Sequence, residues 1–399
     1  MIFIYPTLIK ICWLILSAML LLPQFVVIPI GAQLLINSIT AVTLGTLLSA
    51  PIHKKAPKDK ESEELERIDD EEADEEIMGT KDALMFPIVA SVSLCVLYFL
   101  VKTINQALVS KLLKLYFSFL GMYALGLFFS HSIVEKYAPY KTVILEKKIK
   151  IPMITEESGY DLKITKGDMF GFSASFIISG YYFFTNFWMF NNIIGLAFTI
   201  GGIKLFKLNN WKIGLVILWG LFLYDIFWVF YTDVMVTVAK MVDGPILLKF
   251  PINLFEQEKK YSMLGLGDML VPGGFVSLAL KFDIDRFIKK NKKGNPVDIV
   301  PVFWAFQVLF YAIGILVTYV NMVVFKHAQP ALLYLVPAAT IAVFAGCVID
   351  GVGLEEIWNY EAVIENKEKK TEDQKKEAEE EEKLDKEVQE ANARKRRGE

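Results

Sequence analysis

Residues 212–231 read KIGLVILWGLFLYDIFWVFY, and Asp225 is the single acid in this apolar run. A helix needs about 20 apolar residues to cross a hydrocarbon core about 30 Å thick, so the stretch predicts one membrane span. An ionised carboxylate at the centre of such a helix costs on the order of 3 kcal/mol even on lenient insertion scales, and carboxylates there usually serve a function. The stretch therefore predicts a membrane protein with a candidate site at Asp225.

The composition of the whole chain agrees with this interpretation. The 399 residues are 54% hydrophobic and 13% aromatic, which is more apolar surface than one soluble core can bury. The charged side chains gather in two runs and a few short loops, so nucleic acid is not an expected partner. The three cysteines lack metal-ligand spacing, and three histidines leave little material for a zinc site or a Ser-His relay. Carboxylates must carry any chemistry, and we expect neither a metal nor another cofactor.

Nine segments have the length and apolarity of a membrane span. They are 26–50, 84–103, 107–131, 168–185, 187–206, 212–231, 264–281, 299–324 and 329–349. Residues 1–25 form a further apolar stretch that could be a cleaved signal sequence, a signal anchor or an extra helix. The fold class we expect is an all-α polytopic membrane protein with about nine transmembrane helices.

The spans divide into groups. Residues 26–206 form an N-terminal five-span bundle that contains the acidic loop 51–83, and residues 207–350 form the catalytic spans six to nine. Residues 351–399 form a charged cytosolic tail. The acidic stretch 61–76 and the end of the tail are dense in Glu and Lys with almost no aromatic residues, so we expect them to be solvated.

Loop charges predict the orientation of the spans. The loop 281–298 carries six basic residues, which favours the cytosolic side. Alternation of nine spans then places the N-terminus in the lumen and the C-terminus in the cytosol. The loop 232–263, which falls in the lumen, carries four lysines. Basic residues are therefore more frequent on the cytosolic side but are not confined to it.

A second acid, Asp268, lies in the stretch LGLGDML of residues 264–270. Asp225 follows Lys212 by 13 residues and Asp268 precedes Lys281 by 13 residues, so at 1.5 Å per residue both carboxyl groups lie about 20 Å from the same membrane face. They can meet there and share one proton. The ionised member of such a pair can activate water and the protonated member can donate to a carbonyl oxygen, which predicts hydrolysis of an amide.

Two short motifs accompany the aspartates. Gly265 and Gly267 let the backbone approach a substrate chain or a neighbouring helix closely, and ordinary helix packing is the alternative. The stretch 329–332 reads Gln-Pro-Ala-Leu. Its proline can hold the chain in an extended conformation that bonds a substrate, or can simply begin a helix.

Together these motifs resemble the signature of the presenilin-type GxGD aspartyl proteases. The signature consists of Tyr224-Asp225, Gly265-Leu266-Gly267-Asp268 and Pro330-Ala331-Leu332, in that order on three late spans. The longer stretches 191–250 and 326–338 resemble signal peptide peptidase. The resemblance runs from about Phe86 to the last span.

The resemblance implies a nine-span intramembrane aspartyl protease of the endoplasmic reticulum. Its substrates would be single transmembrane helices, such as remnant signal peptides and other type II membrane segments. Asp225 and Asp268 would be the catalytic pair, and the residues that support the active site would be Tyr224, Gly265, Leu266, Gly267, Gln329, Pro330, Ala331 and Leu332. Residues 245–251 would be an extended segment, between spans six and seven, that pairs with an unwound substrate strand.

Partners and location also follow from the resemblance. The partners would be transmembrane-helix substrates and the lipid bilayer, and a homo-oligomer or degradation machinery could be among them. The chain ends Arg-Arg-Gly-Glu instead of in a dilysine signal, and it has no Asn-x-Ser/Thr sequon. Other endomembranes therefore stay open beside the endoplasmic reticulum.

Two other classes of function also remain open. A cation or proton transporter could use intramembrane acids, but it would need more polar groups than Gln307 and Asn321, which the late spans offer. A non-catalytic degradation adaptor could share the fold but would not require both aspartates.

Overall fold

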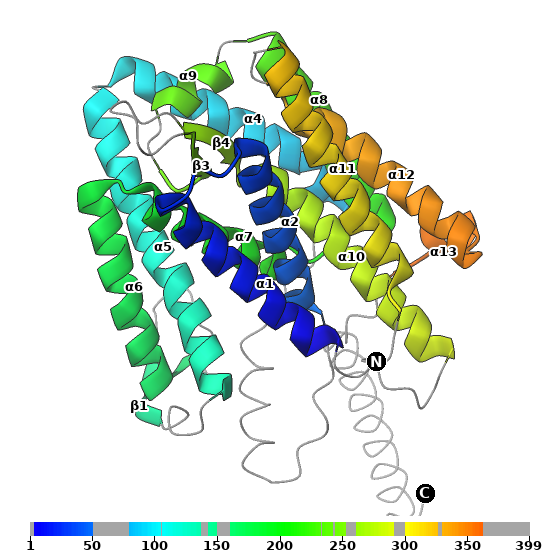
Figure 1. Ribbon diagram of the computed structural model, residues 1–399, viewed down its shortest axis with the longest axis horizontal. Coiled ribbons are helices and arrows are strands. Elements are labelled where there is room, and N and C mark those ends of the chain that lie inside the picture. Colours follow the sequence, from blue (N-terminus) through cyan, green and yellow to red (C-terminus); the bar gives the residue numbers. More distant parts are fainter. Residues whose placement is uncertain are drawn as a thin grey trace, which may run out of the picture. The chain divides into compact units, whose positions relative to one another are not determined.

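The computed structural model describes most of the apolar part of the chain (Figure 1). The described residues are 4–50, 80–104, 106–136, 143–149, 160–232, 234–241, 244–252, 261–290, 300–325 and 329–361. Residues 51–79 of the predicted acidic loop and residues 362–399 of the predicted tail lie outside them.

Long helices make up most of the described chain. They are α1 (Ile4–Leu21), α2 (Ile30–Ser49), α4 (Thr80–Thr103), α5 (Gln106–Lys136), α6 (Lys166–Thr185), α7 (Trp188–Leu205), α8 (Trp211–Phe230), α10 (Gly267–Lys290), α11 (Val302–Phe325) and α12 (Leu332–Asp350). Seven segments of the described chain are long and apolar enough to cross a membrane: α1 with the turn after it, α2, α4, α5, α8, α11 and α12. The prediction of an all-α polytopic membrane protein is confirmed, and the number of nine spans stays a prediction.

Each of the nine predicted spans coincides with a helix, and α1 comes in addition. Leu8 and Ile9 of α1 pack against a buried cluster formed by Leu47 of α2 with Leu280 and Ile284 of α10. Residues 1–25 therefore contribute a helix that packs on the bundle.

The shorter elements lie between the long helices. They are η1 (Leu22–Gln24), α9 (Val234–Met241), α13 (Leu354–Trp358) and two antiparallel pairs, β1 (Val143–Ile149) with β2 (Tyr160–Thr165) and β3 (Leu247–Pro251) with β4 (Tyr261–Gly265). The sequence did not predict the β1–β2 pair. The β3–β4 hairpin lies between α8 and α10, where an extended segment was expected.

The helices around the hairpin pack closely through glycines. A Cβ atom at Gly273 of α10 would lie 2.5 Å from the side chain of Ile203 on α7, and one at Gly45 of α2 would lie 2.9 Å from the same side chain. Small residues let helix backbones approach in this way within membranes. As a result, α2 and α10 both pack against the side chain of Ile203 on α7.

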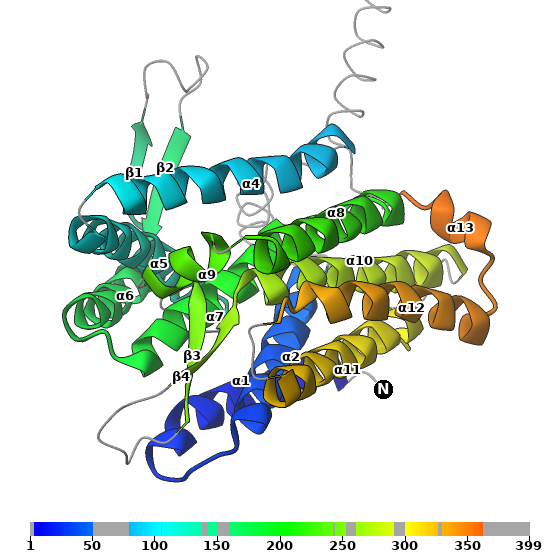
Figure 2. The ribbon, with the colours of Figure 1, turned by 90° about the horizontal axis from the view of Figure 1, so that it is seen from above.

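The four late helices lie side by side, as Figures 1 and 2 both show. An aromatic cluster fixes α8 against α10 and α11. Trp211 lies 5.1 Å from Phe275 and 5.7 Å from Phe282 between ring centroids, and Phe282 lies 4.9 Å from Phe303. The three contacts have steep interplanar angles, which is the favoured edge-to-face arrangement. The cluster therefore holds in register the helices that carry the two aspartates.

Candidate active site

Asp225 lies in the last third of α8 and is 4% exposed. The backbone N–H of Leu332, the first residue of α12, faces its carboxyl group. The first N–H groups of a helix lack intrahelical partners and carry the positive end of the helix dipole. The start of α12 is thus suited to stabilise negative charge on Asp225.

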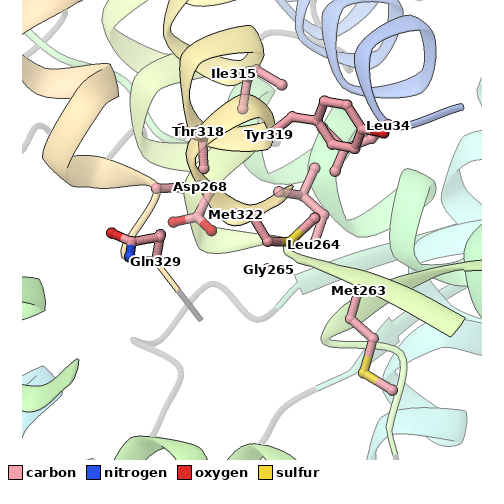
Figure 3. Close-up of a pocket in the computed structure, with 11 residues that line it drawn as sticks. Leu34, Met263, Leu264, Gly265, Asp268, Ile315, Thr318, Tyr319, Met322 and Gln329 are labelled. Atoms are coloured by element: carbon pink, nitrogen blue, oxygen red, sulfur yellow. The ribbon is translucent and has the colours of Figure 1, made fainter. Parts of the chain in front are cut away.

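Asp268 lies in the first turn of α10, and its side chain is only partly buried. It lines a cavity of about 70 Å³, which has room for water molecules. Figure 3 shows its carboxyl group beside Gln329, which comes from the segment before α12. The cavity is lined by Leu34, Met263, Leu264, Gly265, Asp268, Ile315, Thr318, Tyr319, Met322, Gln329 and Ala331.

The two aspartates lie close enough for their charges to interact. They come from α8 and α10, which contact one another. One carboxyl group is buried beneath a helix N-terminus and the other reaches an accessible cavity. The arrangement can therefore hold one shared proton and still admit water.

The Gly265-Leu266-Gly267 motif lies at the junction between β4 and α10. Gly265 ends β4 and Gly267 begins α10, so the predicted start of this span at residue 264 is wrong by three residues. A Cβ atom at Gly265 would lie 3.1 Å from Oδ2 of Asp268, whereas one at Gly267 would meet nothing within 4 Å. The backbone N–H of Leu266 donates to the Ile246 carbonyl at 3.1 Å, which ties this crossing to the residue before β3.

The Gln-Pro-Ala-Leu stretch lies beside the same cavity. Gln329 and Ala331 line it, and Pro330 and Leu332 are buried next to them. Pro330 stands before the first turn of α12, and its carbonyl accepts the N–H of Leu333 at 3.2 Å. Pro330 therefore begins the helix, as one of the two interpretations expected. The other, that it holds an extended segment which bonds a substrate, stays a prediction.

Tyr224 is one of the predicted site residues that do not line the cavity, and the others are Asp225, Leu266, Gly267, Pro330 and Leu332. The Tyr224 side chain is half-buried, and its ring lies 6.3 Å from that of Trp228 one turn further along α8. It adjoins Asp225 in sequence and packs along α8, and its support of the site stays a prediction.

One residue close to the site belongs to none of the predicted motifs. Tyr311 of α11 is 3% exposed, and its hydroxyl group lies 3.5 Å from the backbone carbonyl of Asp268. Ser38 of α2 hydrogen-bonds the same tyrosine. An isolated tyrosine in an apolar span gives no sequence signal, so only the fold reveals it.

The β3–β4 hairpin leads directly into Asp268, and only one of its edges is open. Side chains from α2 and α7 hydrogen-bond the backbone along the outer edge of β3. The expectation that residues 245–251 pair with a substrate strand is therefore wrong for this edge. Among the residues that the structure describes, none hydrogen-bonds the backbone of β4 along the side facing away from β3.

Comparisons with known proteins show the family of the chain. Residues 70–363 match the family model described as signal peptide peptidase. The chain is 37% identical to the mouse (Mus musculus) signal peptide peptidase, over 74% of this chain and 79% of the relative. It is 38% identical to the human (Homo sapiens) signal peptide peptidase, over 66% of this chain and 68% of the relative. It is also 43% identical to the Caenorhabditis elegans intramembrane protease 2, over 44% of this chain and 38% of the relative. No solved structure matches the chain. A family match that covers most of the chain, on a polytopic helical fold, shows that the chain belongs to the signal peptide peptidase family of intramembrane proteases.

Proposed function

We propose that this protein is an aspartyl protease that hydrolyses peptide bonds within single transmembrane helices, with Asp225 and Asp268 as its catalytic pair. One observation carries the proposal: Asp268 lines a cavity that admits water, and the buried carboxyl group of Asp225 lies within electrostatic reach of it. The match to the signal peptide peptidase family supports the same reaction.

The chemistry follows from one proton shared by two carboxyl groups. The ionised carboxylate takes a proton from a water molecule as the water oxygen attacks the peptide carbonyl. The protonated carboxyl group donates to the carbonyl oxygen, which gives a tetrahedral diol. When the C–N bond breaks, one carboxyl group gives its proton to the leaving amine and the other takes a hydroxyl proton from the diol, so the pair again holds one proton. The Leu332 N–H beside Asp225 stabilises the negative charge that remains. Because the two groups titrate together, the roles of base and acid belong to the pair, and neither role is assigned to one of the two residues.

The substrate must unwind before it is cut, because a helix hides its carbonyls in intrahelical hydrogen bonds. New backbone hydrogen bonds must replace the ones lost, since lipid offers none. We infer that the substrate adds as a strand to β4. The Leu266 N–H bonds the Ile246 carbonyl, so by the alternation of an antiparallel ladder Met263 and Gly265 direct their backbone groups away from β3. Asp268 follows three residues later.

The location and substrate class rest on the family and on loop charge. The substrates would be remnant signal peptides and other type II membrane segments in the endoplasmic reticulum, with other endomembranes open. The basic end of α10 favours a cytosolic position, which gives a lumenal N-terminus and a cytosolic C-terminus. A homo-oligomer or degradation machinery would be further partners.

The test is a cleavage assay on the purified chain in liposomes, with a signal-peptide-like helix as substrate. We expect the wild type to cut, and both Asp225→Asn and Asp268→Asn to abolish cleavage while keeping the wild-type thermal stability. If either variant cuts at the wild-type rate, the pair is not catalytic. Aspartate-dependent proton or cation flux without cleavage would support a transporter instead.

A further inference from the structure

Two neighbouring asparagines of α7 hydrogen-bond the backbone of β3. Asn191 and Asn192 are 0% and 4% exposed. Nδ2 of Asn191 donates to the carbonyl of Leu247 at 2.7 Å. Asn192 accepts the backbone N–H of Lys249 at 2.8 Å and donates Nδ2 to the carbonyl of the same residue at 2.9 Å. One carboxamide thus binds both backbone groups of a strand residue, as a neighbouring strand would.

A third carboxamide continues this edge from another helix. Gln33 of α2 is 2% exposed, and its Nε2 donates to the carbonyl of Pro251 at 3.2 Å. The three bonded positions, Leu247, Lys249 and Pro251, are alternate residues, whose backbone groups face the same side of a strand. Pro251 has no N–H to satisfy. We call Gln33, Asn191 and Asn192 the amide clamp, because together they bond the outer edge of β3 with side chains in place of a strand.

The clamp holds β3 at a short distance from α7. Gly195 lies one turn after Asn191, and a Cβ atom there would lie 2.8 Å from Cδ2 of Leu248 and 3.4 Å from the carbonyl oxygen of Pro245. The missing side chain lets the strand come within reach of the asparagines. Hydrogen bonds are directional, whereas apolar contacts are not, so the clamp fixes where β3 lies along α7 as well as how close it lies.

We propose that the amide clamp sets which peptide bond of the substrate meets the aspartates, an inference that rests on the proposed function. The substrate strand would pair with β4, and β4 is paired with β3 in a fixed register from Leu247 opposite Gly265 to Pro251 opposite Tyr261. Asp225, however, is carried by α8 and not by the hairpin. The clamp ties the hairpin to α2 and α7, and both of these helices contact α10, which the aromatic cluster holds against α8. The clamp therefore aligns the substrate strand with both carboxyl groups. Gln33, Asn191 and Asn192 are positioning residues in this scheme.

The variant Asn192→Leu tests the clamp, because leucine has a similar size and removes both bonds to Lys249. The purified chain in liposomes would be given one transmembrane-helix substrate, and the products would be identified by mass spectrometry. We expect the principal cleavage site to lose its dominance to bonds two residues away, since a two-residue slip keeps the same side chains on the same face of a strand. We expect kcat to fall by roughly tenfold to a hundredfold, because misplacement by about 1 Å has an effect of that size.

Control variants separate positioning from stability. Gln307→Leu removes another buried carboxamide bond between helices, from Nε2 to the Ala339 carbonyl at 3.0 Å, and we expect it to keep the wild-type products. Asn192→Gln keeps a carboxamide and should restore part of the principal product. If Asn192→Leu does not fold, Asn192→Asp keeps the acceptor for the Lys249 N–H and loses the donor. Wild-type products and a wild-type kcat in the folded Asn192 variant would overturn the inference.

A measurement without substrate separates this inference from the proposed function. Hydrogen–deuterium exchange over residues 244–252 should be slow in the wild type and faster in Asn192→Leu, while Gln307→Leu leaves it slow. Unchanged exchange in Asn192→Leu contradicts the clamp whether or not the protein cuts. A wild type that does not cut, or an Asp268→Asn variant that does, contradicts the proposed function alone.

Discussion

Gly265 and Gly267 flank one leucine, yet their surroundings differ. The missing side chain of Gly265 leaves room for the Asp268 carboxyl group, because a Cβ atom would lie 3.1 Å from Oδ2. The missing side chain of Gly267 faces open space within the described structure. The first glycine therefore protects the geometry of Asp268, one of the two proposed catalytic groups, and the second leaves space beside the start of α10 that no described residue fills.

These surroundings predict different kinetic effects for two alanine variants. Gly265→Ala should press on Asp268 and lower kcat by roughly tenfold to a hundredfold, with a smaller effect on KM. A methyl group at residue 267 would meet no atom of the described residues within 4 Å, so Gly267→Ala should keep the thermal stability. It should raise KM if the substrate passes over the start of α10. Steady-state kinetics on one substrate would distinguish the two. A wild-type KM for Gly267→Ala would mean that the substrate does not approach this residue.

At the scale of elements, β4 is the strand on which the substrate proposal depends. The Leu266 N–H bonds the Ile246 carbonyl, and backbone groups alternate between the two sides along a strand. The N–H of Leu264 therefore faces β3, whereas that of Met263 faces away from it. Proline is tolerated in a strand where its missing N–H would face away from the neighbouring strand. The two positions therefore allow the two edges of one strand to be tested separately.

Met263→Pro should abolish or strongly reduce cleavage while the thermal stability stays near that of the wild type. Leu264→Pro removes a ladder hydrogen bond and should destabilise the hairpin as well. Cleavage would be measured with the liposome assay, and hairpin stability by hydrogen exchange over residues 261–266. Full activity in Met263→Pro would show that the substrate does not bond this edge.

The elements also show what could be predicted from the sequence. The long helices follow from apolar length, and the equal spacing of Asp225 and Asp268 from basic residues predicted their meeting, because the rise of a helix is fixed. The start of α10 was misplaced because residues 263–270 are apolar throughout apart from glycines and Asp268, and such a run does not mark where a strand ends. The amide clamp was missed since adjacent asparagines in an apolar span match no motif. Their role depends on a strand 55 residues away in sequence, from Asn192 to Leu247.

At the scale of the whole molecule, the chain after α12 folds back onto the basic end of α10. Gly351 turns the chain with a φ of 63°, a left-handed conformation that favours glycine. The Tyr360 hydroxyl group then donates to Oδ2 of Asp285 at 2.6 Å, and its ring lies 4.8 Å from that of Phe282. Burial, together with the charge of Asp285, raises the pKa of Tyr360, so the hydroxyl group stays protonated and keeps donating. Residues 351–360 thus close the aromatic cluster that aligns α8, α10 and α11.

This contact predicts where the chain can be shortened. The compact unit of the fold ends at Tyr360 and the family match ends at residue 363, so a chain ending at Tyr360 should keep the wild-type stability and cleavage. A chain ending at Asp350 loses α13 and Tyr360. It should be less stable by roughly 2–3 kcal/mol or more, because a hydrogen bond to a charged group and buried aromatic surface are lost together.

Thermal unfolding in detergent would compare the two truncated chains, and Tyr360→Phe in the full chain would isolate the hydrogen bond to Asp285. We expect Tyr360→Phe to lie between the wild type and the chain ending at Asp350. Because the aromatic cluster aligns the helices that carry Asp225 and Asp268, cleavage should fall along with stability across this series. Equal stability of the two truncated chains would show that the folded-back segment does not support the bundle.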